Sequence, residues 1–173
     1  NLIRSNRSII TKIYMPKFIL LLSRMLVCGF KMMISFGVVG VMMVGFRVRP
    51  TGSIVYMLPI LAVLFLFTFG ICNIFMHYGV YVNDLSYIVG IVLTMLMYLT
   101  GVFYNVAKRI PEPFGELMEK YNPVAFLISS ARGVLLYGQA PDWALLGMWL
   151  LVSFVLIVFG VATIYRNENA YVK

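Results

Sequence analysis

The sequence predicts an all-α integral membrane protein: four transmembrane helices, an N-terminal amphipathic helix and a short re-entrant helical hairpin on the outer side. Three observations lead to this fold class. The 173 residues are 62% hydrophobic and 12% charged, whereas soluble domains carry about 25% charged residues. Four apolar runs reach the roughly 20 residues that a helix needs to cross a bilayer. These runs lack the alternation of barrel strands, and only helices or closed barrels satisfy the backbone in lipid.

Charged and turn-forming residues separate the four expected spans, which cover 25–46, 54–75, 85–107 and 143–165. Pro59 is expected to kink the second helix near its start, because proline removes a backbone hydrogen bond. An even number of crossings places both termini on one side of the membrane. Basic residues beside the first span favour the cytoplasmic side for both.

The longest segment outside the spans contains two short apolar units. In the first, apolar residues between Phe114 and Tyr121 recur at helical spacing. The second opens with Asn122 as a cap and Pro123 as the first helical residue, and it is too short to cross a bilayer. We expect a hairpin of two helices over 113–137 that dips back into the outer leaflet. The alternative is an amphipathic connector lying on the membrane surface.

Enzyme chemistry is not expected. The chain contains no GxxxxGK[ST] phosphate-binding motif. Its one histidine, His77, excludes a zinc site built on a histidine pair, and Cys28 and Cys72 lie inside apolar runs as small hydrophobes. The net charge of +8 fits lysines and arginines beside anionic lipid headgroups rather than a nucleic-acid partner. We therefore expect no metal and no cofactor on this chain, and any transport would draw its energy from another subunit.

A basic amphipathic helix is expected over residues 4–14. Its apolar residues share one face and its basic residues occupy the rest. The residues that carry this prediction are Arg7, Ile10, Lys12, Ile13 and Tyr14. Pro16 prevents smooth continuation into the next helix. Such a helix either binds lipid headgroups or is the surface on which a cytoplasmic motor pushes.

The segment IITKIYMPKFILLLS resembles the stretch before the third membrane helix of ABC-2 type permeases, in particular the polysaccharide and polyol-phosphate exporters of the O-antigen (Wzm) and teichoic acid (TagG) type. The matching positions are Lys12, Tyr14, Met15, Pro16, Lys17, Ile19, Leu20, Leu22 and Ser23. Asp84 fits the family's F-R-D turn, although Asn83 replaces its arginine. Asn122, Pro123 and Arg132 fit the outer loop. The resemblance covers nearly the whole chain in the right order.

Family membership would imply a permease with six membrane helices. Residues 1–173 would then be the last four helices of a single, N-terminally incomplete transmembrane domain. The permease would form a homodimer and bind a cytoplasmic ATPase that holds ATP and Mg, with 4–14 as the coupling helix. Its substrate would be a lipid-linked glycan, exported across the bacterial cytoplasmic membrane.

The same resemblance suggests roles for individual residues. Aromatic rings would stack on sugars and basic groups would contact carrier phosphates. The substrate path would include Arg24, Lys31, Tyr98, Phe103 and Tyr104, with Phe30 and Phe36 as further aromatic faces. The outer gate would include Phe114, Asn122, Pro123 and Arg132. Each cation has an alternative role at the headgroups, and each aromatic side chain has one in lipid contact. An ABC-2 permease for a drug or lipid, and a non-transport membrane scaffold, stay open as alternatives.

Overall fold

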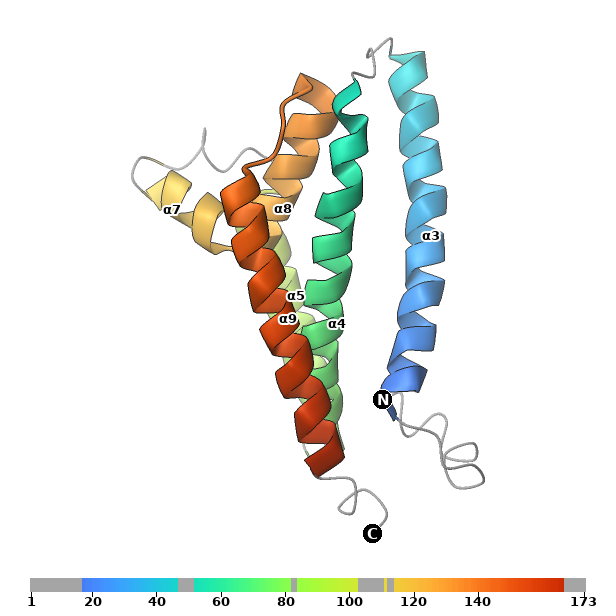
Figure 1. Ribbon diagram of the computed structural model, residues 1–173, viewed down its shortest axis with the longest axis vertical. Coiled ribbons are helices and arrows are strands. Elements are labelled where there is room, and N and C mark those ends of the chain that lie inside the picture. Colours follow the sequence, from blue (N-terminus) through green and yellow to red (C-terminus); the bar gives the residue numbers. More distant parts are fainter. Residues whose placement is uncertain (1–16, 47–51, 82–83, 103–110, 112–113, 167–173) are drawn as a thin grey trace. The chain divides into compact units, whose positions relative to one another are not determined.

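The structure, a computed structural model, describes residues 17–46, 52–81, 84–102, 111 and 114–166 (Figure 1). Every secondary-structure element in these ranges is helical, which confirms the predicted all-α class. In chain order the elements are α3 (Lys17–Gly45), η1 (Gly52–Tyr56), α4 (Met57–Tyr81), α5 (Leu85–Leu99), α7 (Phe114–Tyr121), α8 (Pro123–Arg132), η2 (Gly133–Tyr137) and α9 (Trp143–Arg166).

Three helical segments are long and apolar enough to cross a membrane, judged by length and composition: Leu21–Gly45, Gly52–Gly79 and Trp143–Thr163. Two shorter apolar helices accompany them, Leu85–Leu99 and Pro123–Tyr137. The described part of the chain therefore holds three of the four predicted spans at full length. The remaining span is represented by the shorter helix α5.

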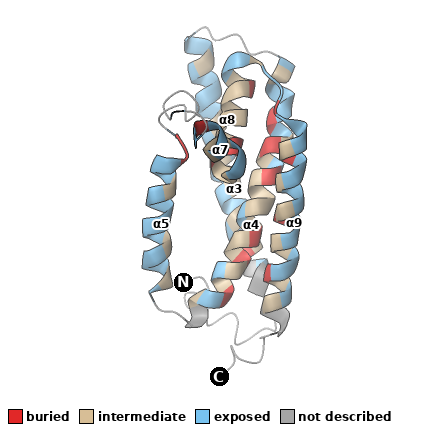
Figure 2. Cartoon of the chain, turned by 90° about the vertical axis from the view of Figure 1, so that its left-hand side faces the viewer, coloured by how far each residue is buried: buried red, intermediate tan, exposed pale blue. Residues whose placement is uncertain are grey.

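Helix α3 begins at Lys17, so the predicted start at residue 25 is corrected toward the N-terminus. Ser23 does not interrupt the helix, because its hydroxyl donates to the carbonyl of Ile19 in the preceding turn at 2.9 Å. Most residues of α3 with a described burial are exposed, as the parts of the helix visible in Figure 2 show in pale blue, and Leu21 is buried. An apolar helix with so little protein cover is typical of a membrane segment whose neighbours are lipid or other helices.

The second predicted span, 54–75, corresponds to η1 followed by α4. Pro59 lies in the first turn of α4, where backbone N–H groups have no partner inside the helix. The proline stands where its missing N–H breaks no hydrogen bond within α4, and the expected kink stays a prediction. Beyond residue 75 the helix continues to Tyr81.

Helix α5 is shorter than predicted. A continuous helix over 85–107 is wrong, because the helix ends at Leu99. The chain turns at Thr100, and Gly101 takes a left-handed conformation with φ of 68°, which glycine adopts without steric cost. Fifteen residues give a helix of about 22 Å, less than the roughly 30 Å of a bilayer core.

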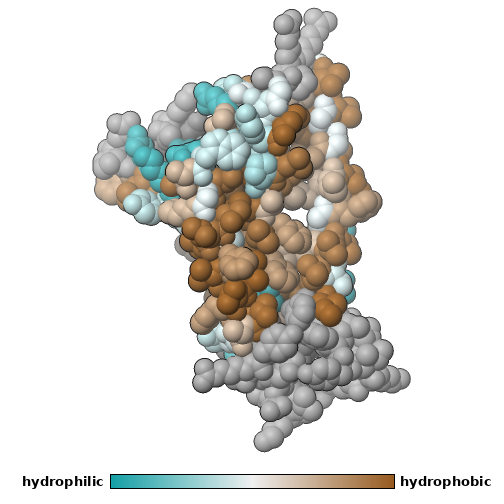
Figure 3. Space-filling model, viewed as in Figure 1, coloured by the Kyte–Doolittle hydropathy of each residue, from teal (hydrophilic) through white to brown (hydrophobic). Residues whose placement is uncertain are grey.

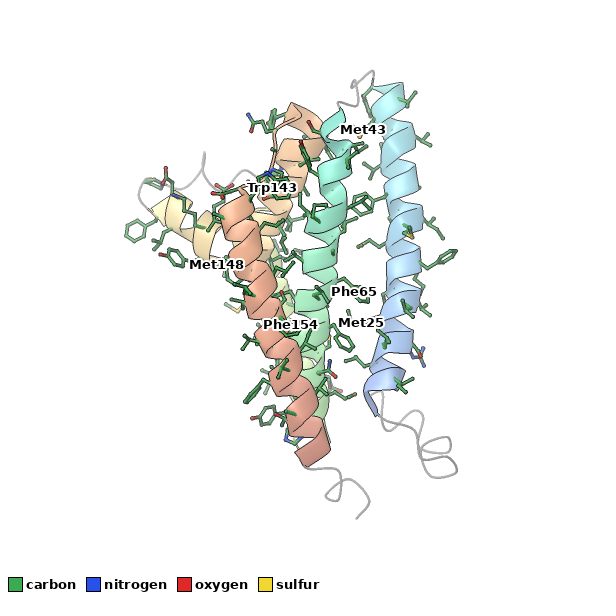
Figure 4. All side chains as sticks on the ribbon, in the orientation of Figure 1. Met25, Met43, Phe65, Trp143, Met148 and Phe154 are labelled. Atoms are coloured by element: carbon green, nitrogen blue, oxygen red, sulfur yellow. The ribbon has the colours of Figure 1, made fainter. Side chains whose placement is uncertain are left out.

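Helix α9 corresponds to the predicted span 143–165. Asp142 caps its start, since the carboxylate accepts from the N–H groups of Ala144 at 3.0 Å and Leu145 at 3.3 Å. Figure 4 labels Trp143 in the first turn and Phe154 further along; they are 53% and 63% exposed. Figure 3 shows hydrophobic residues over α9, as expected of a helix in contact with lipid.

The chain divides into two compact units, each described by itself. The first comprises 1–47, 66–86 and 152–173, and the second comprises 48–65 and 87–151. In the first unit, the second half of α4 packs closely against the second half of α9. A Cβ built on Gly70 would lie 2.8 Å from Cβ of Leu156, and one built on Gly160 would lie 2.8 Å from Cβ of Asn73. These glycines therefore permit the close approach of the two helices.

Polar side chains are also buried in the first unit: Asn73, His77 and Ser153. The Asn73 side-chain nitrogen donates to the carbonyl of Phe69 at 2.8 Å, so this nitrogen has a hydrogen-bond partner within α4. The His77 ring lies edge-on to Tyr78, with centroids 5.1 Å apart.

Candidate functional site

The predicted coupling helix over 4–14 lies outside the described residues. The same is true of Arg7, Ile10, Lys12, Ile13, Tyr14 and Pro16, and of Phe103 and Tyr104 from the predicted substrate path. Their roles stay predictions.

The remaining residues of the predicted substrate path belong to different compact units. Arg24 and Lys31 are exposed on α3 in the first unit. They are seven positions apart, so they project from the same side of the helix two turns apart. Tyr98 lies near the end of α5 in the second unit and is 61% exposed. Of the two additional aromatics on α3, Phe30 is 66% exposed and Phe36 is partly buried.

The predicted outer hairpin is the part of the candidate site that the structure describes best. Its two helices, α7 and α8, pack against each other. The Asn122 side chain accepts from the N–H groups of Val124 at 3.1 Å and Ala125 at 3.3 Å, and Pro123 is the first residue of α8. The predicted cap and first residue are confirmed. This capping residue lies directly between the helices and so fixes the turn of the hairpin.

A second contact joins the two helices of the hairpin. The Ser129 hydroxyl on α8 donates to the Glu119 carboxylate on α7, in a partly buried position. Glu116 and Lys120 form an exposed ion pair at 3.4 Å within α7, and such i,i+4 pairs stabilise a helix by about 0.2–0.5 kcal/mol. Hydrophilic residues accordingly gather over α7 in Figure 3.

Most of the predicted apolar face of α7 is exposed, although its Met118 is partly buried. Phe114, Leu117 and Tyr121 are 66%, 55% and 70% exposed. The packed side of α7 instead contains Gly115, which is buried. The short helix thus presents its apolar residues outward, the arrangement of an amphipathic helix at a membrane boundary.

Arg132 connects the hairpin to α5. It is the last residue of α8, and its guanidinium donates to the carbonyl of Gly101 at 3.0 Å and of Val102 at 3.4 Å. Thr100, next to this turn, is 2% exposed. The positive charge lies where the carbonyls at the end of a helix carry partial negative charge.

The far end of the hairpin is connected to the start of α4. η1 packs against η2, and the Ser53 hydroxyl donates to the carbonyl of Gly138 at 2.7 Å. Gly138 ends η2 in a left-handed conformation with φ of 64°. Beside this contact, the rings of Tyr56 and Trp143 meet edge to face with centroids 5.5 Å apart. Tyr and Trp are enriched at the level of the lipid headgroups, so this pair is well suited to a membrane interface.

Sequence reasoning missed several of these contacts. Nothing in the local pattern signals the pairing of Ser53 with Gly138 or of Ser129 with Glu119. The glycine after the apolar run that ends at Tyr137 is a recognisable helix terminator and marks the end of the hairpin.

Among the described residues, no group of three or more His, Cys, Asp or Glu side chains is placed to hold a metal ion. The second unit contains a helical hairpin that side chain to backbone hydrogen bonds attach to neighbouring segments at two points, Arg132 and Gly138.

Comparison with known proteins assigns the chain to a family. The ABC-2 type transporter family matches residues 3–136. Two proteins of Klebsiella pneumoniae named O-antigen export system permease protein RfbA are 28% and 26% identical to the chain over 170 residues, or 98% of its length. The chain spans 64% of the length of each of these relatives. No solved structure matches significantly. The match over 3–136 and the apolar helices of the fold together show that this chain belongs to the ABC-2 type transporter family.

Proposed function

We propose that this chain is the membrane-spanning part of an exporter permease that moves a lipid-linked polysaccharide across the bacterial cytoplasmic membrane. The polymer would be of the O-antigen, capsule or teichoic acid class. The observation that carries the proposal is the family match over 3–136, on a chain whose described residues include three long apolar helices. The names of the two Klebsiella relatives support polysaccharide as the cargo.

Energy for transport would come from a separate cytoplasmic ATPase that binds ATP and Mg. The 173 residues contain no GxxxxGK[ST] motif, so this segment has no phosphate-binding loop of that kind. The helix over 4–14 would rest on the ATPase, and its apolar residues would provide most of the contact, since buried apolar and aromatic anchors dominate interfaces. Two copies of the permease would form the working dimer, with both ends of this segment in the cytoplasm.

Four spans and a re-entrant hairpin form the proposed topology. α3, α4, α5 and α9 would cross the membrane or enter it, and α7, α8 and η2 would fold back at the outer side. Helix α5 is too short to cross the bilayer core by itself, so its end at Leu99 would lie within the membrane. An irregular turn at membrane depth is tolerated where protein or a water-filled path surrounds it, and Thr100 and Gly101 are buried by protein.

Different residues would contact the phosphate groups and the sugar rings of the substrate. Arg24 and Lys31 on α3 offer two positive charges on one side of a largely apolar helix, and they would form charge-assisted hydrogen bonds to the phosphates of a lipid carrier. Tyr98, Phe103 and Tyr104 would provide flat faces for sugar rings. The hairpin, with Phe114, Asn122, Pro123 and Arg132, would close the outer end of the path.

The test is a glycan assay in the host cell. The gene is deleted in a strain with intact polysaccharide synthesis, and polymer is measured at the cell surface and in the cytoplasmic fraction. Loss of surface polymer with accumulation of lipid-linked polymer inside is expected, and the full-length protein should restore export. Unchanged surface polymer would contradict the cargo assignment, and a change in drug resistance or membrane lipid distribution instead would indicate a permease for such compounds.

A further inference from the structure

Arg132 makes a long-range contact with a segment outside the hairpin. Its guanidinium bonds to two successive carbonyls, those of Gly101 and Val102, which are about thirty positions earlier in the chain. Both carbonyls belong to the turn that follows the end of α5 at Leu99. One side chain thus holds the end of α8 to the end of α5.

The chemistry of arginine suits this position. The guanidinium is planar, stays charged at every physiological pH and carries five N–H donors in a fixed fork. Carbonyl groups after the last turn of α5 lack helical partners, and in a membrane protein each unsatisfied carbonyl is costly. A hydrogen bond from a charged donor is roughly twice as strong as one between neutral groups. A lysine offers the charge but no fork, so it matches two adjacent carbonyls less well.

The position of Arg132 within the hairpin is equally specific. It is the last residue of α8, and the helix widens directly after it into the π-type turn η2. Single π turns within helices occur frequently at functional sites. Beyond η2, Gly138 accepts the hydrogen bond from Ser53 at 2.7 Å. The π turn is therefore bounded by two attachments to other helices.

We infer that Arg132 is a positioning residue that acts as a latch: it fixes the hairpin of α7, α8 and η2 against the end of α5 and must release the Gly101 and Val102 carbonyls when the hairpin moves. The inference deepens the proposed gate. Its function in export rests on the proposed function, whereas the latch itself is a property of the fold.

The first test measures amide hydrogen exchange and needs neither substrate nor ATPase. Full-length protein in lipid nanodiscs is compared as wild type, Arg132→Met and Lys120→Met. The last is a matched control, because Lys120 is a cation on the same hairpin whose exposed ion pair stays within α7. In Arg132→Met, amides of 96–102 should exchange about tenfold faster or more, while those of 70–74 in α4 stay unchanged. Arg132→Lys should fall between wild type and Arg132→Met.

Three results would overturn the latch. These are equal exchange at 96–102 in wild type and Arg132→Met, an equal rise in Lys120→Met, and a rise of similar size throughout α4, which would make Arg132 a general element of the fold.

A second readout separates positioning from stability. In the complex with its ATPase, Arg132→Met should reduce glycan exported per ATP hydrolysed at least about fivefold, with ATP hydrolysis within about twofold of wild type. Faster exchange at 96–102 without any ATP-driven export in the wild type would uphold the latch and reject the exporter.

Discussion

The contact between α4 and α9 gives the sharpest prediction for stability. Gly160 is buried against α4, and a Cβ built there would lie 2.8 Å from Cβ of Asn73 and 3.3 Å from the carbonyl oxygen of Gly70. Carbon atoms in ordinary contact are about 3.5–4.0 Å apart. Neither neighbour can rotate away, because one is backbone and the other is fixed directly to it. Gly160→Ala therefore requires the helices to separate by about 1 Å.

The magnitude follows from two opposing effects. Forcing an extra carbon into a well-packed contact costs about 1–3 kcal/mol. Replacing glycine by alanine inside a helix contributes about 1 kcal/mol in the other direction. Gly147, on the same helix, allows the packing cost to be measured apart from the gain in helix propensity, because a Cβ built there meets no described atom within 4 Å. Gly147→Ala should be neutral or stabilising, and the free energy of unfolding of Gly160→Ala should be about 1–3 kcal/mol lower than that of Gly147→Ala.

Thermal unfolding of the full-length protein in detergent measures this difference. For proteins of this size, 1 kcal/mol corresponds to a shift of about 2–4 °C in the unfolding midpoint. Gly160→Ala should therefore unfold several degrees below Gly147→Ala, and Gly70→Ala should behave like Gly160→Ala, because its Cβ would lie 2.8 Å from Cβ of Leu156. A midpoint for Gly160→Ala at or above that of Gly147→Ala would refute the close contact of the two helices.

Three further substitutions test the second unit, each by the unfolding midpoint. Asn122→Ala removes the cap of α8 and should cost about 1 kcal/mol; Asn122→Ser should retain most of the stability, and equal midpoints for the two variants would argue against capping. Ser53→Ala removes the hydrogen bond to Gly138 and should cost about 0.5–1.5 kcal/mol, with no loss if the contact is absent in the membrane. Tyr56→Leu keeps an apolar side chain but loses the edge-to-face pair with Trp143, for about 0.5–1.5 kcal/mol; an unchanged midpoint would contradict a contribution from that pair.

The elements that sequence reasoning predicted well are those fixed by local or solvent-imposed rules. Bilayer thickness dictates the length of an apolar helix, so the run after Asp142 marked α9 almost to the residue. Capping chemistry is equally local: Asn122 followed by Pro123 predicts a helix start with a mechanism, and the structure has that start.

The errors arise where composition carries no signal. Residues 100–107 are free of charge, so hydropathy extends the third span through them, whereas the left-handed Gly101 ends the helix before them. Likewise, the first predicted span starts at residue 25, directly after Arg24, although α3 already begins at Lys17.

The contacts between residues far apart in the chain could not be predicted for a different reason. The contacts of Arg132 with Gly101, and of Gly160 with Asn73, join segments far apart in the chain. Periodicity identifies faces of helices but not which faces meet. Arg132 was expected in the outer gate, but a single sequence could not indicate that its partners are backbone carbonyls.

The most direct test of the central proposal, a permease driven by a separate ATPase, is co-purification. The tagged full-length protein is isolated from its host in mild detergent beside Ile13→Asp, which places a charge in the proposed seat of the ATPase. The proposal predicts that an ATPase with a GxxxxGK[ST] motif accompanies the wild type and is lost from Ile13→Asp, while the membrane protein itself remains intact. Recovery of the wild type without any such ATPase would contradict it.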